Sequence, residues 1–300
     1  MQRGFMLLLL AICWSTAFPF TGFLSETQGL SPLLIAYSRI VCGALFMLVA
    51  LLLMRQPLPT RLRDWLVLVA IGLSGNVLPF MLIAWGQREV DSGVTAVLIA
   101  MVPLFIVVMA HYFTRDERLT RMKVLAVLVA FAGACVIALP SALGQFAAPL
   151  TAYLAIGLAT LCYAITGQLV YTVRHLPPLS QSSAALLMAA LVMTPLVALS
   201  GPELWQGSSA IDWGVLAYLG LISTGLASWL LAVAVGRYGP SSIVVPNYLV
   251  PVLGLVLGFF LRGDRLESIQ VGEISLPVQA IGVALVFLGL LLVAVAQRRA

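Results

Sequence analysis

Ten long apolar runs, joined by short polar connections, take up almost the whole 300-residue chain. They lie at roughly 4–24, 32–53, 64–85, 92–112, 119–138, 149–171, 179–200, 211–235, 240–260 and 278–296. A helix needs about 20 apolar residues to cross roughly 30 Å of bilayer hydrocarbon, and the runs lack the period-two alternation of membrane β-strands. Only 9% of the residues are charged, against about 25% in soluble proteins. We therefore expect an all-α polytopic membrane protein with ten transmembrane helices.

The chain contains an internal repeat. Residues 64–90 recur at 212–238, an offset of 148, and the first and sixth runs match at an offset of 149. The matched positions are Asp64-Trp65 with Asp212-Trp213, Gly72-Leu73 with Gly220-Leu221, Pro103 with Pro251, and Cys13-Trp14 with Cys162-Tyr163. They predict two five-helix repeats, residues 1–140 and 141–300. Because an odd number of spans separates the copies, we expect the second repeat to be inverted, as in carriers that open alternately to each side of a bilayer.

The positions of the basic residues orient the spans, because cytoplasmic loops collect Lys and Arg. With a cytoplasmic N-terminus, twelve basic residues fall inside: Arg3, Arg55, Arg61, Arg63, Arg115, Arg118, Arg121, Lys123, Arg174, Arg237, Arg298 and Arg299. Only Arg88, Arg262 and Arg265 then fall outside. We therefore expect both termini in the cytoplasm. The net charge of +5 follows from this bias, so nucleic-acid binding is not expected.

Taken together, these features resemble the EamA-type ten-helix exporters of the drug/metabolite transporter superfamily over essentially the whole chain. The resemblance rests on the two repeats, an aromatic residue in the first helix of each, a proline in the fourth, and the turns Glu117-Arg118-Leu119 and Asp264-Arg265-Leu266. The chain departs from it at Cys13-Trp14-Ser15, where many members have Trp-Gly, and in an insertion after span 9 through about Pro277. The resemblance implies export of amino acids or related small metabolites across a bacterial inner membrane.

Spans 3 and 8 carry matching stripes of small and polar residues. Asn76 and Phe80 follow Gly72 at helical spacing, and Thr224 and Ser228 lie on the equivalent face of span 8. Polar groups at membrane depth are costly and usually face the bundle interior or a cavity. One interpretation is that these side chains line a substrate cavity. The other is a helix–helix contact between small residues, reinforced by hydrogen bonds.

The spans contain four candidate gating hinges: Pro79, Pro103, Pro246 and Pro251. Each proline removes a hydrogen bond from its helix and favours a kink. Asn247 and Tyr248, next to the third of them, are candidates for the cavity, since freed carbonyls and an amide can contact a ligand. The alternative is that the prolines bend their helices without moving.

Three aromatic residues and one cation complete the candidate site. Trp14 and Tyr163 occupy equivalent repeat positions, and Tyr37 lies in span 2. Arg39 is the only charged residue clearly within a predicted span. It can receive a substrate carboxylate through two parallel hydrogen bonds, snorkel to the outer interface, or satisfy helix carbonyls, and these interpretations stay open.

The expected mechanism is alternating access around a central cavity between the repeats. The sequence shows no acidic residue deep in any predicted span and no nucleotide-binding motif. We therefore expect a carrier driven chiefly by the substrate gradient, with no cofactor or metal. Its expected partners are a small-molecule substrate and the lipid bilayer, and no obligate protein partner is implied. The alternatives are a channel, which needs a charged ring or carbonyl filter, and a membrane-embedded enzyme, which needs a convergent catalytic cluster.

Overall fold

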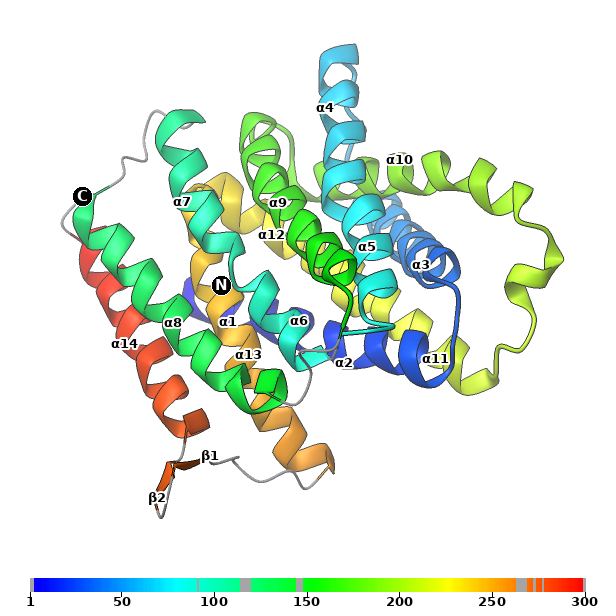
Figure 1. The fold of residues 1–300 in the computed structure, drawn as a ribbon. Helices are drawn as coiled ribbons and strands as arrows, with labels where there is room; N and C mark the ends of the chain where they lie inside the picture. The colour runs from blue at the N-terminus through cyan, green and yellow to red at the C-terminus, as the bar shows by residue number, and fades with distance from the viewer. Residues whose placement is uncertain are drawn as a thin grey trace.

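The computed structural model describes residues 3–90, 92–113, 120–143, 148–262, 269–271, 274–276 and 278–298, and these are almost wholly helical (Figure 1). The first half forms α1 (Arg3–Ser15), α2 (Ala17–Gly22), η1 (Phe23–Thr27), α3 (Pro32–Leu53), α4 (Leu62–Gly72), η2 (Leu73–Val77), α5 (Leu78–Gly86), α6 (Ser92–Ile99), α7 (Val102–Phe113) and α8 (Arg121–Leu143). The second half forms α9 (Leu150–Thr172), α10 (Pro178–Leu199), η3 (Pro202–Trp205), α11 (Ala210–Tyr218), η4 (Leu219–Leu226), α12 (Ala227–Tyr238), η5 (Pro240–Ile243), α13 (Val244–Arg262) and α14 (Val278–Arg298).

Among the described residues, six helical segments are long and apolar enough to cross a membrane. They are Arg3–Ser25, Pro32–Leu53, Leu62–Gly86, Leu150–Thr172, Pro178–Leu199 and Ala210–Tyr238. The other four expected spans fall on α6–α7, α8, α13 and α14, and their crossing of the bilayer stays a prediction. Large apolar side chains such as Leu53 and Leu199 lie exposed on the outside of the bundle, where lipid would cover them. The fold is that of a polytopic helical membrane protein.

A short hairpin between α13 and α14 departs from the all-helical expectation. β1 (Ile269–Val271) pairs antiparallel with β2 (Ile274–Leu276), with Ile269 opposite Leu276. Both segments alternate apolar and polar residues, and β-branched residues favour strands. The hairpin lies within the insertion that distinguishes this chain. The remainder of that insertion lies outside the described residues.

Spans 3 and 8 share an irregularity that the sequence did not predict. Span 3 passes from α4 through the π-helical turn η2 into α5, and span 8 passes from α11 through η4 into α12. The five residues of η2 correspond to residues 221–225 of η4 at the offset of 148. π-Helical turns are rare and occur frequently at functional sites. The two copies of the repeated segment therefore share a backbone distortion as well as a sequence.

Pro103 and Pro251 occupy equivalent positions but affect their helices differently. α6 ends at Ile99 and α7 begins at Val102, with a turn between them, whereas Pro251 lies inside the continuous helix α13. Proline lacks the N–H that would bond the carbonyl four residues earlier. The carbonyls of Ile99 and Asn247 therefore lose their helical donors in both copies.

The last helices of the two predicted repeats, α8 and α14, lie side by side and run antiparallel (Figure 1). A Cβ atom added to Gly133 would lie 2.6 Å from the Val286 amide nitrogen, and one added to Gly282 would lie 2.7 Å from that of Ile137. Gly282 and Val286 follow Gly133 and Ile137 by 149 positions, so the contact is reciprocal, as at a two-fold axis. Only glycine allows backbones to approach so closely.

The second helices, α3 and α10, also pack antiparallel. The Tyr37 hydroxyl lies 3.4 Å from the Thr194 hydroxyl at one end of the contact. At the other end, the Ser183 hydroxyl donates to the Met47 carbonyl at 3.0 Å. Equivalent helices thus run in opposite directions at two separate places in the bundle.

The matched glycines of spans 3 and 8 pack against these second helices. A Cβ atom added to Gly72 would lie 2.7 Å from the Ala185 carbonyl oxygen of α10. One added to Gly220 would lie 3.0 Å from the Arg39 carbonyl oxygen of α3. The third helix of each predicted repeat therefore packs closely on the second helix of the other.

Candidate functional site

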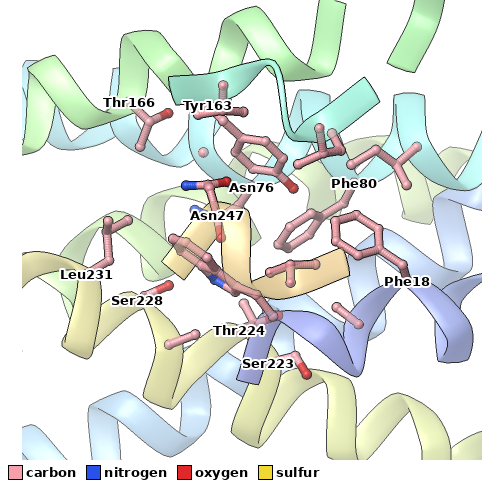
Figure 2. Close-up of a pocket in the computed structure, with 18 of the residues that line it drawn as sticks. Phe18, Asn76, Phe80, Tyr163, Thr166, Ser223, Thr224, Ser228, Leu231 and Asn247 are labelled. Carbon is pink, nitrogen blue, oxygen red and sulfur yellow. The ribbon is translucent and has the colours of Figure 1, made fainter. Parts of the chain in front are cut away.

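A central cavity with an empty volume of about 870 Å³, counted with its opening, is the candidate site (Figure 2). Small-molecule sites are mostly apolar with a few placed polar groups. The lining comes from α1, α2, α3, η2, α5, α6, α7, α9, η4, α12, η5 and α13. Helices from both predicted repeats therefore meet at one space in the interior.

The lining is built from equivalent positions of the two repeats. Of its 22 residues, eighteen form nine pairs at the offset of 148 or 149. The pairs are Trp14 with Tyr163, Ala17 with Thr166, Phe18 with Gly167, Gly75 with Ser223, Asn76 with Thr224, Phe80 with Ser228, Ile83 with Leu231, Ile99 with Asn247, and Val102 with Val250. The four without a paired lining residue are Thr21, Arg39, Ala227 and Ile243. The described lining of the cavity therefore consists mostly of matching positions of the sequence repeat.

Eight of the ten residues predicted for a cavity line this one: Trp14, Arg39, Asn76, Phe80, Tyr163, Thr224, Ser228 and Asn247. The labelled side chains of Asn76, Phe80, Tyr163 and Asn247 converge on one space in Figure 2. Their contact with a substrate stays a prediction. The four candidate hinge prolines, Pro79, Pro103, Pro246 and Pro251, lie next to lining residues in the chain without lining the cavity themselves. Their movement also stays a prediction.

The structure places two of the predicted residues elsewhere. Tyr248 is fully buried against α8, where its hydroxyl donates to the Val127 carbonyl at 2.9 Å. Tyr37 packs its ring edge-on against Trp205. Successive helical residues are rotated by about 100°, so Tyr248 points away from the cavity that Asn247 lines. Tyr37 is two residues from Arg39 and lies on the opposite face of α3.

Arg39 is directed inward. Its side chain is only 5% exposed, its Nε donates to the Thr224 hydroxyl at 3.1 Å, and its Nη1 lies at a long 3.5 Å from the Thr21 hydroxyl. The guanidinium carbon lies 3.7 Å from the centre of the Phe80 ring, a favourable cation–π position. These partners are hydroxyls and a ring, so snorkelling and helix-carbonyl binding are not observed.

The polar groups of spans 3 and 8 meet the cavity at the π-helical turns. Asn76 in η2 and Thr224 in η4 are both buried. Within the described part of the chain, the Asn76 amide has no hydrogen-bond partner. Asn247 of α13 donates from its amide nitrogen to the Ile243 carbonyl at 2.8 Å, which leaves its amide oxygen as an acceptor. The cavity thus holds polar groups that the protein itself does not satisfy.

Sequence reasoning did not single out several lining residues. Phe18 lies about one helical turn from Trp14 in span 1, and Thr166 lies about one turn from Tyr163 in α9. The Thr166 hydroxyl also shares a hydrogen bond of 2.8 Å with that of Ser74. The repeat offset carries the missing information, because it relates Phe18 to Gly167 and Thr166 to Ala17. Thr21 has no such indication and is identified only by its contact with Arg39.

A smaller cavity of about 370 Å³ adjoins the central one. The two share Gly75, Asn76, Thr166, Ser228 and Leu231. The smaller one continues toward Val170, near the end of α9, and Gln181, near the start of α10. The predicted topology places these helix ends at the cytoplasmic face.

Comparisons with known proteins give one consistent family. A family model described as the EamA-like transporter family matches residues 3–139 and 150–295. A probable terminal-alkyne amino-acid exporter of Streptantibioticus cattleyicolor is 27% identical, over 96% of this chain and 91% of that protein. An uncharacterized transporter of Archaeoglobus fulgidus is 25% identical, over 89% of this chain and 92% of its own. These descriptions indicate a transporter and not an enzyme.

A solved structure supports the fold. The crystal structure of another protein superposes on this one with a TM-score of 0.75. The match covers 99% of this chain and 98% of that protein's chain. Its sequence is 20% identical to this one, so the likeness concerns the fold alone.

Proposed function

The chain belongs to the EamA-like transporter family, and from that premise we propose that it exports amino acids or related small metabolites from a bacterial cytoplasm. The proposed location is the inner membrane, with both termini in the cytoplasm. The proposed architecture is ten spans in two inverted repeats, residues 1–140 and 141–300. The relative named as an amino-acid exporter favours amino acids among the substrates.

The matched lining of the central cavity carries the proposal. A site that opens alternately to two sides needs two halves that can exchange roles around it. Nine pairs of lining residues at the repeat offset provide equivalent surfaces on both sides of one site. A cavity at an unrelated place in the bundle would not draw its lining from matched positions.

Helix packing supports the inversion of the repeats. Equivalent helices that lie antiparallel across reciprocal contacts are what a two-fold axis in the membrane plane requires. α8 and α14 have this arrangement, and α3 and α10 also pack antiparallel. The close packing of Gly72 on α10 and of Gly220 on α3 adds a matched contact between the halves.

Alternating access would then proceed by movement of one repeat against the other around the central cavity. The smaller cavity, which leads toward helix ends predicted to be cytoplasmic, supports an inner path for substrate entry. Pro103, at the start of α7 after the break that follows α6, and Pro251, inside α13, are the proposed hinges. Each lies four residues from a lining residue of its own span.

The test is transport of an amino-acid panel by the purified protein in proteoliposomes. We expect saturable transport and counterflow, in which unlabelled substrate on one side drives labelled substrate to accumulate from the other. A channel, the alternative class, would conduct without saturation or counterflow. Absence of transport for every amino acid in the panel would contradict the proposed substrate class.

Energy coupling needs its own measurement. We propose that the substrate gradient drives export, since the described lining of the central cavity includes no acidic residue and membrane carboxylates mark many proton-coupled carriers. Efflux from proteoliposomes without a pH or ion gradient is therefore expected. Strict dependence on a proton gradient would contradict it.

A further inference from the structure

Arg39 is a buried cation, and in the described part of the chain it has no counter-charge. The described residues that line the central cavity include no acidic one, and no described carboxylate lies within 4 Å of the guanidinium. Removing a charge from water is expensive unless it is paired and hydrogen-bonded. The missing negative charge at Arg39 points to an anionic group on the ligand.

The donors of Arg39 are only partly used. A guanidinium carries five N–H donors in a planar fork, and two of them point at the hydroxyls of Thr224 and Thr21. The remaining three have no acceptor among the described residues. Phe80 lies against one face of the group and fixes its plane. An oriented fork with unused donors matches the two oxygens of a carboxylate.

The lining of the central cavity also offers acceptors. Asn76 has an unpartnered amide, and Asn247 offers its amide oxygen. The carbonyls of Ile99 and Asn247 lack helical donors because prolines follow four residues later. Ile99 also ends α6, and the C-terminal end of a helix favours cations. This group of acceptors suits an ammonium.

We propose that the cavity binds its substrate as an α-amino acid zwitterion, with the carboxylate on Arg39 and the ammonium among Asn76, Asn247 and Ile99. This assignment rests on the proposed function and names the substrate class of that site. Phe80, which lies under the guanidinium, is one turn from Asn76, or about 6 Å along the helix axis. Two hydrogen bonds of about 2.8 Å each and the short carboxylate-to-ammonium separation of an α-amino acid span a comparable distance.

The apolar part of the lining determines which side chains of an amino-acid substrate would fit the cavity. Trp14, Tyr163, Phe18 and Ile83 contribute mostly ring and aliphatic surface. Among the lining residues that the structure describes, Arg39 alone is charged. An apolar or small side chain therefore fits, whereas a second charge would lack a partner.

Binding to the purified full-length chain in lipid nanodiscs tests the assignment with three probes. L-Leucine has both charged groups, L-leucinamide lacks the carboxylate, and 4-methylpentanoic acid lacks the ammonium. The expected affinity for leucine exceeds that for either analogue by about 10- to 100-fold, the range for one hydrogen-bonded charge. Equal binding of all three probes, or no binding of leucine, would overturn the assignment.

Variants separate the two ends of the ligand. Arg39→Gln is expected to abolish the preference for leucine over leucinamide. Arg39→Lys is expected to keep part of it, because lysine retains the charge without the planar fork. Asn76→Leu is expected to reduce only the preference for leucine over 4-methylpentanoic acid. Arg174→Gln is the matched control, since Arg174 lies 3.9 Å over the Tyr171 ring but is exposed outside the cavity.

The outcomes distinguish this inference from the proposed function. Unfolding of Arg39→Gln is checked by thermal melting, and Arg39→Lys supplies the second reading of the carboxylate arm. If the parent protein transports amino acids and Arg39→Gln still prefers leucine to leucinamide, the inference is wrong and the function stands. If the parent binds leucine through Arg39 but moves no amino acid in proteoliposomes, the function is wrong and the binding site stands.

Discussion

The two walls of the central cavity use the same nine positions with different side chains. The wall from residues 14–102 has Phe18, Phe80 and Ile99, where the wall from residues 163–250 has Gly167, Ser228 and Asn247. At these three pairs, bulk and apolar surface come from the first wall, and space and polar groups come from the second. An equivalent backbone on both sides suits a carrier that must open two ways, and unequal side chains give the ligand one orientation.

Arg39 and Thr21 sharpen this contrast. Both belong to the first repeat and have no paired lining residue in the central cavity. The residue at the position of Thr21 in the second repeat is Val170, which lines the smaller cavity. The cation that would meet the substrate carboxylate therefore belongs to the first repeat. The matched backbone positions and the unequal side chains can be tested separately.

The largest effect is expected at Gly72 and Gly220, which occupy matching positions of the sequence repeat and both pack closely on a neighbouring helix. Gly72→Val and Gly220→Val each push a branched side chain against backbone atoms of α10 and α3, and backbone cannot rotate away. Overpacking of this kind costs about 1–3 kcal/mol or more. Both variants should lower the thermal stability by similar amounts, measured by melting in detergent. Gly214→Val is the control, because a Cβ atom there meets nothing within 4 Å.

Unequal losses for the two glycines would separate their roles. If only one variant were destabilised, spans 3 and 8 would not pack equivalently, and the proposed two-fold relation would fail at this contact.

The next effect is expected from making the second wall copy the first. Ser228→Phe places a ring opposite Phe80 and fills the space that the substrate needs. Overpacking of about 1–3 kcal/mol corresponds to a loss of about 5- to 150-fold in substrate occupancy, so export in proteoliposomes should fall by at least about fivefold while the fold persists. Leu221→Phe, on the exposed side of η4, is the control. Normal export by Ser228→Phe would show that substrate does not use this cavity.

A smaller effect is expected at the polar member of another pair. Asn247→Ile makes this position of the second wall identical to its counterpart in the first wall, Ile99. It removes one uncharged acceptor, worth about 1 kcal/mol or roughly fivefold in affinity. The KM for export should rise about that much with little change in maximal rate. A change in rate alone would place Asn247 in movement and not in binding.

Part of this site could be predicted because the internal repeat is still detectable in the amino-acid sequence. Asn76 and Thr224 were predicted from their alignment, and the same offset relates every paired lining residue, including Phe18 and Gly167, which were not singled out. The offset relates positions of the two sequence copies, and both members of nine such pairs line the same cavity.

Rotation about the helix axis is what the sequence left undetermined. Tyr37 and Tyr248 were assigned to the cavity by type and depth, and each points away because a neighbour one or two residues along the helix faces inward. Hydrophobic periodicity is weak when lipid and protein interior are both apolar. The π-helical turns η2 and η4 further change the direction in which the following side chains point around the helix axis. Nothing in the residue types predicted these turns. The partners of Arg39 depend on long-range packing of α2 and η4 on α3.

The smallest effect is expected at the first residues of the repeated segment, Asp64 and Asp212, which are identical in sequence and differ in role. The Asp64 carboxylate lies 3.2 Å from His175 Nε2. Asp212 accepts from the Ser209 backbone N–H at 2.8 Å and completes a capping box. When His175 is protonated, this half-exposed pair contributes at most about 1 kcal/mol and is screened by salt. At such a pH, His175→Gln should lower the melting temperature slightly, and less at high salt. Asp212→Ala removes an acceptor of the capping box and should cost about 1 kcal/mol with little dependence on salt. Equal, salt-independent losses would mean that both carboxylates act as helix caps.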